Sequence, residues 1–348
     1  MRTSRTMLRA FALATVIGAV ATAAAPLAAA APEDRRPPAA HRPTVWAIPG
    51  TDAGPEGIAR DPYQPYFYTG STGDGAVYRG DLRTGAVEPF LAPGADGRAT
   101  AVGMKVDAHG RLIIAGGSTG KVWVYDTHTR KLLHTFDTGL TSHAGLTSDA
   151  GPTAGFLNDL TVADDGDVYV TDSVQPRLYR IAADQLGGHA PATSRLPVFE
   201  EFAGTPIVFR GGFNLNGIVV TPDQRYVIVA HDNDSALYRI DRRTKDIRRI
   251  DLGGAGVTGD GLLMRGHTLY ALSSVDHIGD NHSIVDVVRL DAGYASGALE
   301  RRATNPLLDR PSTGAFDGDA ILAVNFQWAV TDPHLPYSVV RVPLRDLT

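Results

Sequence analysis

One short motif recurs four times along this chain, each time with a polar residue at its head and an apolar run behind it. The heads are Glu56, Asn158, Asn216 and Asp260. In the first three copies the apolar run begins ten positions after the head, and in the fourth it begins nine positions after, because the turn at Arg265 is one residue shorter. A repeat of constant phase predicts a fold assembled from copies of one supersecondary unit.

The unit is predicted to be a small sheet. Runs of four to six β-prone residues recur throughout the chain and are separated by Gly, Asp, Asn and Pro turns, whereas sustained helical periodicity is missing. Residues 181–186 are expected to form one helical turn at most. Many short strands at even spacing indicate an all-β protein. A repeat of roughly 45–58 residues with about four strands is typical of a propeller blade.

Two further positions share the phase of the heads, Val102 and approximately Ser312, which brings the predicted number of blades to six. The last blade lacks an outer strand after residues 339–344, and the strand expected at Thr44–Ile48 would supply it. Such a pairing would close the ring and remove an open sheet edge. A pair of β-sandwiches, or a propeller with one blade more or fewer, remains an alternative.

The N-terminal segment predicts export. A basic start (residues 1–9) precedes an apolar stretch from Ala10 to about Ala25 and a run of small residues, as in a secretory signal peptide. We expect residues 1–30 to be the signal peptide, 31–43 a disordered leader rich in Pro, Arg and Ala, and 44–348 one propeller domain. The chain has no cysteine and a net charge of −5. The scattered charges do not suggest a nucleic-acid surface, and we expect a secreted monomer without a membrane span.

Residues at equal phase in a propeller form a ring around the axis, so the four polar heads are predicted to converge there. Carboxylate and amide oxygens are the ligands that Ca²⁺ prefers. Mg²⁺ and Mn²⁺ fit less well, and Zn²⁺ is the least favoured ion because the set contains no His or Cys. Four protein ligands would leave positions open for water and substrate. Taken singly, each Asn or Asp could instead shape a turn.

The motifs resemble those of the senescence marker protein, gluconolactonase and luciferin-regenerating enzyme family, also called the regucalcin family. The resemblance covers most of the chain after the leader. It implies a six-bladed propeller that holds a divalent ion, usually Ca²⁺, with Glu56, Asn158, Asn216 and Asp260 as ligands. It also implies that Asp260 acts as general base or nucleophile. The segments that carry the resemblance are 55–58, 158–159 with 165–172, 216–223 and 260–261.

We therefore expect a secreted, calcium-dependent hydrolase that acts on a small-molecule lactone or related ester. Loops at the ligand end contribute further polar residues, among them His231 and Asp232. His231 closes a strand of the same repeat as Asn216, and we expect it to lie near the ring and to move protons. The alternative is a non-catalytic secreted propeller that binds a ligand or a protein on its top face, since one fold hosts many functions.

Overall fold

Aspartates at the hairpin turns show why the short β-prone runs become strands. The carboxylates of Asp81, Asp126 and Asp241 each accept hydrogen bonds from the backbone N–H groups two and three residues further on. This interaction fixes a tight turn, so the chain reverses and pairs with itself. Strands joined by such turns form antiparallel sheets.

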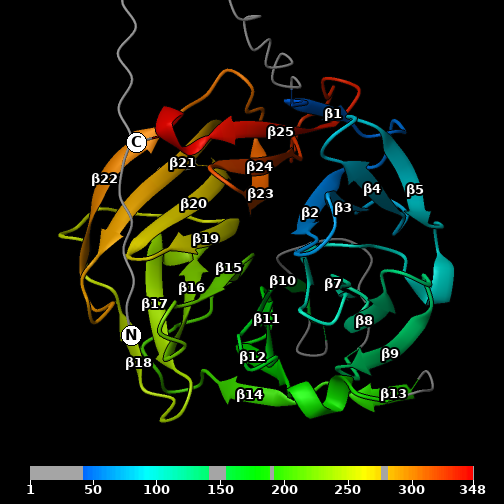
Figure 1. Ribbon diagram of the computed structural model, residues 1–348. Coiled ribbons are helices and arrows are strands. Elements are labelled where there is room, and N and C mark those ends of the chain that lie inside the picture. Colours follow the sequence, from blue (N-terminus) through cyan, green and yellow to red (C-terminus); the bar gives the residue numbers. More distant parts are fainter. Residues whose placement is uncertain (1–41, 141–153, 189–191, 276–280, 348) are drawn as a thin grey trace, which may run out of the picture. The chain divides into compact units, whose positions relative to one another are not determined.

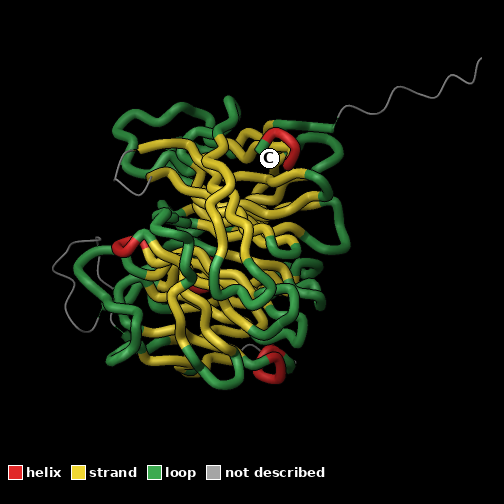
Figure 2. Tube along the Cα trace, turned by 90° about the vertical axis from the view of Figure 1, so that its left-hand side faces the viewer, coloured by secondary structure: helices red, strands yellow, loops and turns green. Residues whose placement is uncertain are grey.

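The computed structural model describes residues 42–140, 154–188, 192–275 and 281–347. These residues form six sheets arranged around a common axis, which confirms the predicted six-bladed propeller (Figure 1). Figure 2 shows strands throughout and helix only as short turns. Those turns are η1 (Ala95–Gly97), η2 (Ala183–Leu186), η3 (Asp232–Asp234) and η4 (Leu344–Asp346).

Each blade begins with its innermost strand and proceeds outward. Blade 1 contains β2 (Pro55–Arg60), β3 (Tyr66–Ser71), β4 (Val77–Asp81) and β5 (Val87–Leu91). Blade 2 contains β6 (Met104–Val106), β7 (Arg111–Ala115), β8 (Lys121–Asp126) and β9 (Leu132–Asp137). Blade 3 contains β10 (Leu157–Val162), β11 (Val168–Asp172), β12 (Arg177–Ile181) and β14 (Val198–Glu201).

The second half follows the same pattern. Blade 4 contains β15 (Leu215–Val220), β16 (Tyr226–His231), β17 (Ala236–Asp241) and β18 (Ile247–Arg249). Blade 5 contains β19 (Gly261–Arg265), β20 (Thr268–Val275), β21 (Asn281–Leu290) and β22 (Gly297–Ala303). Blade 6 contains β23 (Pro311–Asp317), β24 (Ala320–Asn325), β25 (Ser338–Pro343) and β1 (Val45–Ala47).

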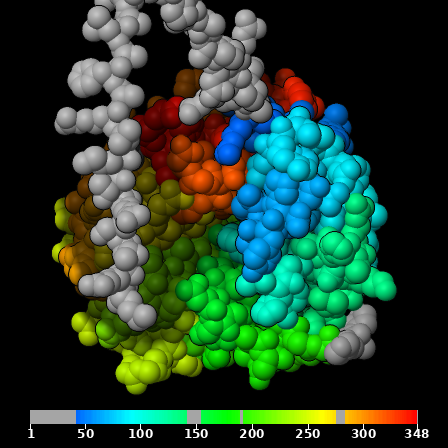
Figure 3. All heavy atoms as spheres, in the orientation of Figure 1, coloured from blue at the N-terminus to red at the C-terminus, as the bar shows by residue number. Residues whose placement is uncertain are grey.

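Strand β1 is the outer strand of blade 6, although it precedes every other strand in the sequence. It pairs antiparallel with β25, with Trp46 opposite Val339. The Trp46 ring is fully buried and meets Phe67 of blade 1 edge to face at 5.5 Å, and its Nε1 donates to Asp81 O at 2.9 Å. In the space-filling view the first and last blades, blue and red, adjoin (Figure 3). One tryptophan therefore links blade 6 to blade 1.

The core is divided among the interfaces between neighbouring blades. The cluster that contains Tyr169 and Leu178 of blade 3 also contains Val227 and Tyr238 of blade 4, and five similar clusters occupy the other interfaces. Both faces of each sheet are covered in this way. The inner strands are therefore held in a fixed ring.

Blade 2 carries a strand that the sequence does not predict. β13 (Ala192–Arg195) pairs parallel with β9 at the outer edge, and all four of its residues are exposed. The helical turn expected within residues 181–186 is present as η2. The predicted signal peptide and nearly all of the leader lie outside the described residues, and no described helix is long and apolar enough to cross a membrane.

Candidate metal and active site

The head residues occupy equivalent places where the innermost strands begin. In four blades the pairing of the first two strands shifts at this point, so that the head and the next residue form a β-bulge. A bulge bends the strand and re-aims its side chains. The bulged pairs are residues 56–57, 158–159, 216–217 and 312–313.

Close contact between successive inner strands fixes the ring at this level. The N–H of Gly103 donates to Asn158 O at 2.9 Å, and the N–H of Gly217 donates to Gly259 O at 2.9 Å. The Ser312 hydroxyl donates to Glu56 O at 2.6 Å. The backbone of Glu56 and Asn158, and that of the residues next to Asn216 and Asp260, is thus tied to a neighbouring blade, which helps to hold the side chains in place.

Three of the predicted ligands are linked by electrostatic effects. Burial raises the pKa of Glu56 well above its ordinary value, and the carboxylates of Asp260 and Asp159 raise it further. Burial likewise raises the pKa of Asp260, the Asp232 carboxylate adds to this, and a hydrogen bond from Asn216 opposes it. Such effects require that these groups lie close together in a poorly solvated space. The fourth predicted ligand, Asn158, is buried and precedes Asp159 on β10.

Five oxygens of the head residues and their neighbours are buried and lack a hydrogen-bond partner. Burying a polar atom without a partner is costly, and native proteins rarely leave several together. A bound cation would satisfy them. They are Glu56 Oε2, Asn158 Oδ1, Asp159 Oδ2, Asn216 Oδ1 and Asp232 Oδ1.

Hydrogen bonding determines which atom of the Asn158 amide is left free. The Ser173 hydroxyl gives its proton to Leu215 O at 2.5 Å, so towards Asn158 it can only accept. Asn158 Nδ2 donates to it at 2.9 Å. The amide must therefore present its oxygen, not its nitrogen, to the remaining space.

The Asn216 amide, like that of Asn158, is oriented so that its oxygen is free. Its Nδ2 donates to Asp232 Oδ2 at 2.9 Å, and a carboxylate accepts but does not donate when ionised. Asn216 Oδ1 is consequently the free atom. Both Asn residues thus offer a carbonyl oxygen, which is the atom that a hard cation requires.

The chemistry of these donor atoms fits Ca²⁺. Among the described residues, no three His, Cys, Asp or Glu side chains stand close enough to hold a metal by themselves, so the amide oxygens are needed to complete a site. The donors in reach are carboxylate and amide oxygens alone, which suits Ca²⁺ better than Zn²⁺.

Two charged residues near the heads were not assigned a role from the sequence. Asp159 is buried and lies 3.7 Å from Lys105 Nζ. Burial raises the pKa of both Asp159 and Glu56, and the Lys105 ammonium opposes this rise in both. Lys105 stands three residues after Val102 on the inner strand of blade 2. The position of Lys105 in the repeat could have indicated its role, because the head position of blade 2 carries no polar side chain.

His231 lies apart from these groups. Its ring is fully buried and packs edge to face against Phe209 and Tyr238, with centroids 6.0 Å away in both cases. Its Nδ1 accepts from Asp234 N at 3.2 Å, and burial lowers the pKa of the ring. A catalytic role for His231 stays a prediction. The neighbouring Asp232, where β16 has ended and the turn η3 begins, contacts Asn216 instead.

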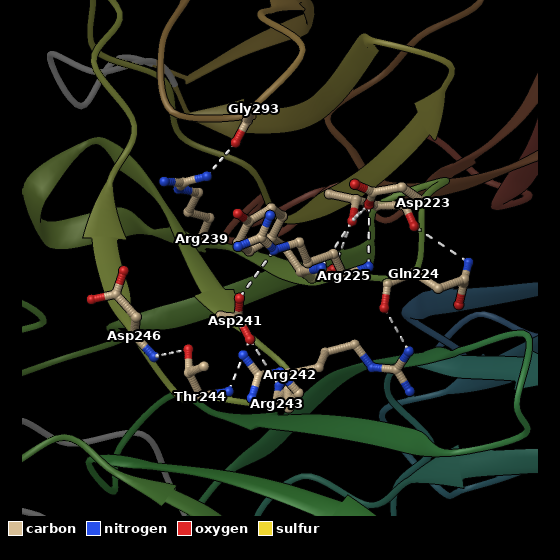
Figure 4. Close-up of polar contacts among 12 residues, drawn as sticks. Asp223, Gln224, Arg225, Arg239, Asp241, Arg242, Arg243, Thr244, Asp246 and Gly293 are labelled. Carbon is tan, nitrogen blue, oxygen red and sulfur yellow. Dashed lines mark hydrogen bonds and ion pairs between the residues drawn. The ribbon is translucent and has the colours of Figure 1, made fainter.

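A cavity of about 510 Å³ lies at the opposite strand ends of blades 3 and 4. Figure 4 shows Arg225 and Arg242 of its lining in polar contact with neighbouring residues. Arg242 contacts Asp165 at 2.6 Å and the Tyr169 hydroxyl at 3.0 Å, and Arg225 contacts Asp241 at 3.1 Å. The Arg242–Asp165 ion pair joins blade 4 to blade 3, whereas the Arg225–Asp241 pair lies within blade 4, and we assign both a structural role.

Comparison with known proteins supports the fold. No family model matches the chain, and a search of curated proteins finds no match. A regucalcin from Agrobacterium tumefaciens, described as a calcium-binding protein, is 16% identical with a TM-score of 0.57 over 87% of this chain and 95% of that one. A gluconolactonase from Xanthomonas campestris is 17% identical, with a TM-score of 0.55 over 86% and 89%.

A third structure has a different activity. Virginiamycin B lyase from Staphylococcus aureus is 12% identical, with a TM-score of 0.54 over 86% of this chain and 98% of that one. At these identities the similarity concerns the fold, and at that level the expected resemblance to regucalcin and gluconolactonase is confirmed. Because a lyase and a gluconolactonase share this fold, function has to be argued from the site.

Proposed function

We propose that this chain is a calcium-dependent hydrolase of a lactone or related ester, with the ring of head residues as its active site. The observation that carries the proposal is the set of buried oxygens without partners, in which two amides are forced to present oxygen. Glu56, Asn158, Asn216 and Asp260 would hold the ion. The signal-like N-terminal segment supports export, and the lactonase-like neighbours support a small-molecule substrate.

Ca²⁺ bound there would polarise the substrate carbonyl and stabilise the negative charge that develops on its oxygen. Asp260 is the partly exposed member of the ligand set, so it is the carboxylate that solvent and substrate can reach. Water attacks the carbonyl carbon, Asp260 takes a proton from it, the ring C–O bond breaks, and the proton passes to the leaving oxygen.

The test is turnover of a panel of lactones and esters by the Asp260→Asn variant in Ca²⁺ and in EDTA. Loss of a general base lowers kcat about 10²–10⁴-fold, so we expect near-complete loss in the variant and in EDTA. Asp246→Asn is the matched control, because Asp246 is exposed at a turn and paired with Arg248. Full activity of Asp260→Asn would refute the assignment. Calcium binding without turnover of any substrate would favour the non-catalytic alternative.

A further inference from the structure

Asp232 has a place in this site that neither the repeat nor the family resemblance assigns. It follows β16 directly and begins the turn η3. Its Oδ2 accepts from Asn216 Nδ2 at 2.9 Å, and its Oδ1 is buried without a partner. Asp232 and Asp260 therefore flank one amide from two different blades.

Together with Asp260, to which Asn216 also donates, Asp232 decides how Asn216 is presented. A carboxamide has nearly the same shape in its two flipped orientations, so hydrogen bonds decide which end faces the site. An ionised carboxylate only accepts hydrogen bonds. It therefore selects the amide orientation in which Nδ2 points towards Asp232 and Oδ1 points into the metal site. An amide at position 232 could both donate and accept, and would lose that selection.

Asp232 also changes the charge of the site. The head residues alone contribute two carboxylates, Glu56 and Asp260. With Asp159 and Asp232 the electrostatically linked carboxylates number four, and the ammonium of Lys105 lies 3.7 Å from Asp159. Carboxylates this close repel one another unless a proton or a cation lies among them.

We propose that Asp232 is a positioning residue of the calcium site, which orients Asn216 through Oδ2 and adds negative charge that a divalent cation compensates. This inference rests on the proposed function. It has an uncommon consequence, because the same side chain destabilises the metal-free protein by repulsion and strengthens metal binding. Substitution of a residue with a purely structural role would instead lower metal-free stability and Ca²⁺ affinity together.

The experiment is calcium titration calorimetry on the Asp232→Asn variant, with thermal unfolding of the metal-free protein measured beside it. Removing a residue that orients a metal ligand typically costs 10–100-fold in affinity. We expect a loss of that size in Ca²⁺ affinity, together with an unfolding temperature in EDTA equal to or higher than that of the wild type. Asp232→Ala should lose Ca²⁺ affinity to at least the same extent.

Asp234→Asn is the matched control. Asp234 belongs to the same turn, but its carboxylate contacts Arg210 and the Tyr238 hydroxyl, so its substitution should leave Ca²⁺ affinity unchanged. Unchanged Ca²⁺ affinity in Asp232→Asn would overturn the inference and leave the proposed function intact. Parallel losses of affinity and metal-free stability would also overturn it. A wild-type protein that binds no Ca²⁺ would overturn both.

Discussion

Replacement of Gly57 by alanine tests whether the head motif is built for close approach between blades. A Cβ placed on Gly57 would lie 2.0 Å from the carbonyl oxygen of Val102 and 2.9 Å from its carbonyl carbon. These are backbone atoms two residues before the inner strand β6 of blade 2, so no rotamer change can relieve the clash. Two inner strands would have to separate, and the hydrogen bonds and core contacts between blades 1 and 2 would weaken.

We expect Gly57→Ala to destabilise the protein by about 3 kcal/mol, at the upper end of the range for overpacked positions. For a protein of this size that loss corresponds to a fall in Tm of roughly 6–12 °C. Equilibrium unfolding in denaturant, with reversibility checked, measures the loss directly. The variant should also bind Ca²⁺ more weakly, because Gly57 follows Glu56.

Gly211→Ala is the matched control. A Cβ on Gly211 meets no atom within 4 Å, and Gly211 does not need a positive φ, so its free energy of unfolding should change by less than about 0.5 kcal/mol. If Gly57→Ala were as stable as Gly211→Ala, the inner strands would not be packed as described, and the rigid ring of ligands would lose its structural basis.

Three further predictions concern the site. Ser173→Ala removes the acceptor of Asn158 Nδ2 and the donor to Leu215 O, so it should cost about 2–4 kcal/mol of stability and weaken Ca²⁺ binding in calorimetry. A variant with wild-type Ca²⁺ affinity would contradict the argument that Ser173 orients the Asn158 amide. Calcium at 100 times its Kd should stabilise the protein by about 2.7 kcal/mol, which EDTA should abolish in thermal unfolding. Finally, burial raises the pKa of Asp232 to about 6, so the folded metal-free protein retains a proton that the unfolded chain releases near pH 4. Metal-free stability should therefore fall as pH rises from about 4 to 6, by up to ~3 kcal/mol, and the fall should shrink in Asp232→Asn; a pH-independent stability would contradict the burial of this carboxylate.

The sequence predicted the fold through local chemistry. Hairpin aspartates such as Asp81 and Asp241, short apolar runs and a constant phase are all readable along the chain, and they identified six blades and the head positions. Even the strand at Thr44–Ile48 could be placed, because blade 6 lacked an outer strand. β13 could not be predicted, since its four residues are exposed and show no apolar alternation.

The sequence by itself determined which residues occupy equivalent positions, because register along a strand depends on local turns and alternation. The tertiary structure decided which atoms of those residues are free. Ser173 and Leu215 belong to different blades, and together they turn the Asn158 oxygen into the site. Asp232 faces Asn216 while His231, its neighbour, packs among aromatic rings. Such choices depend on hydrogen bonds and burial between segments far apart in the chain, which no local pattern encodes.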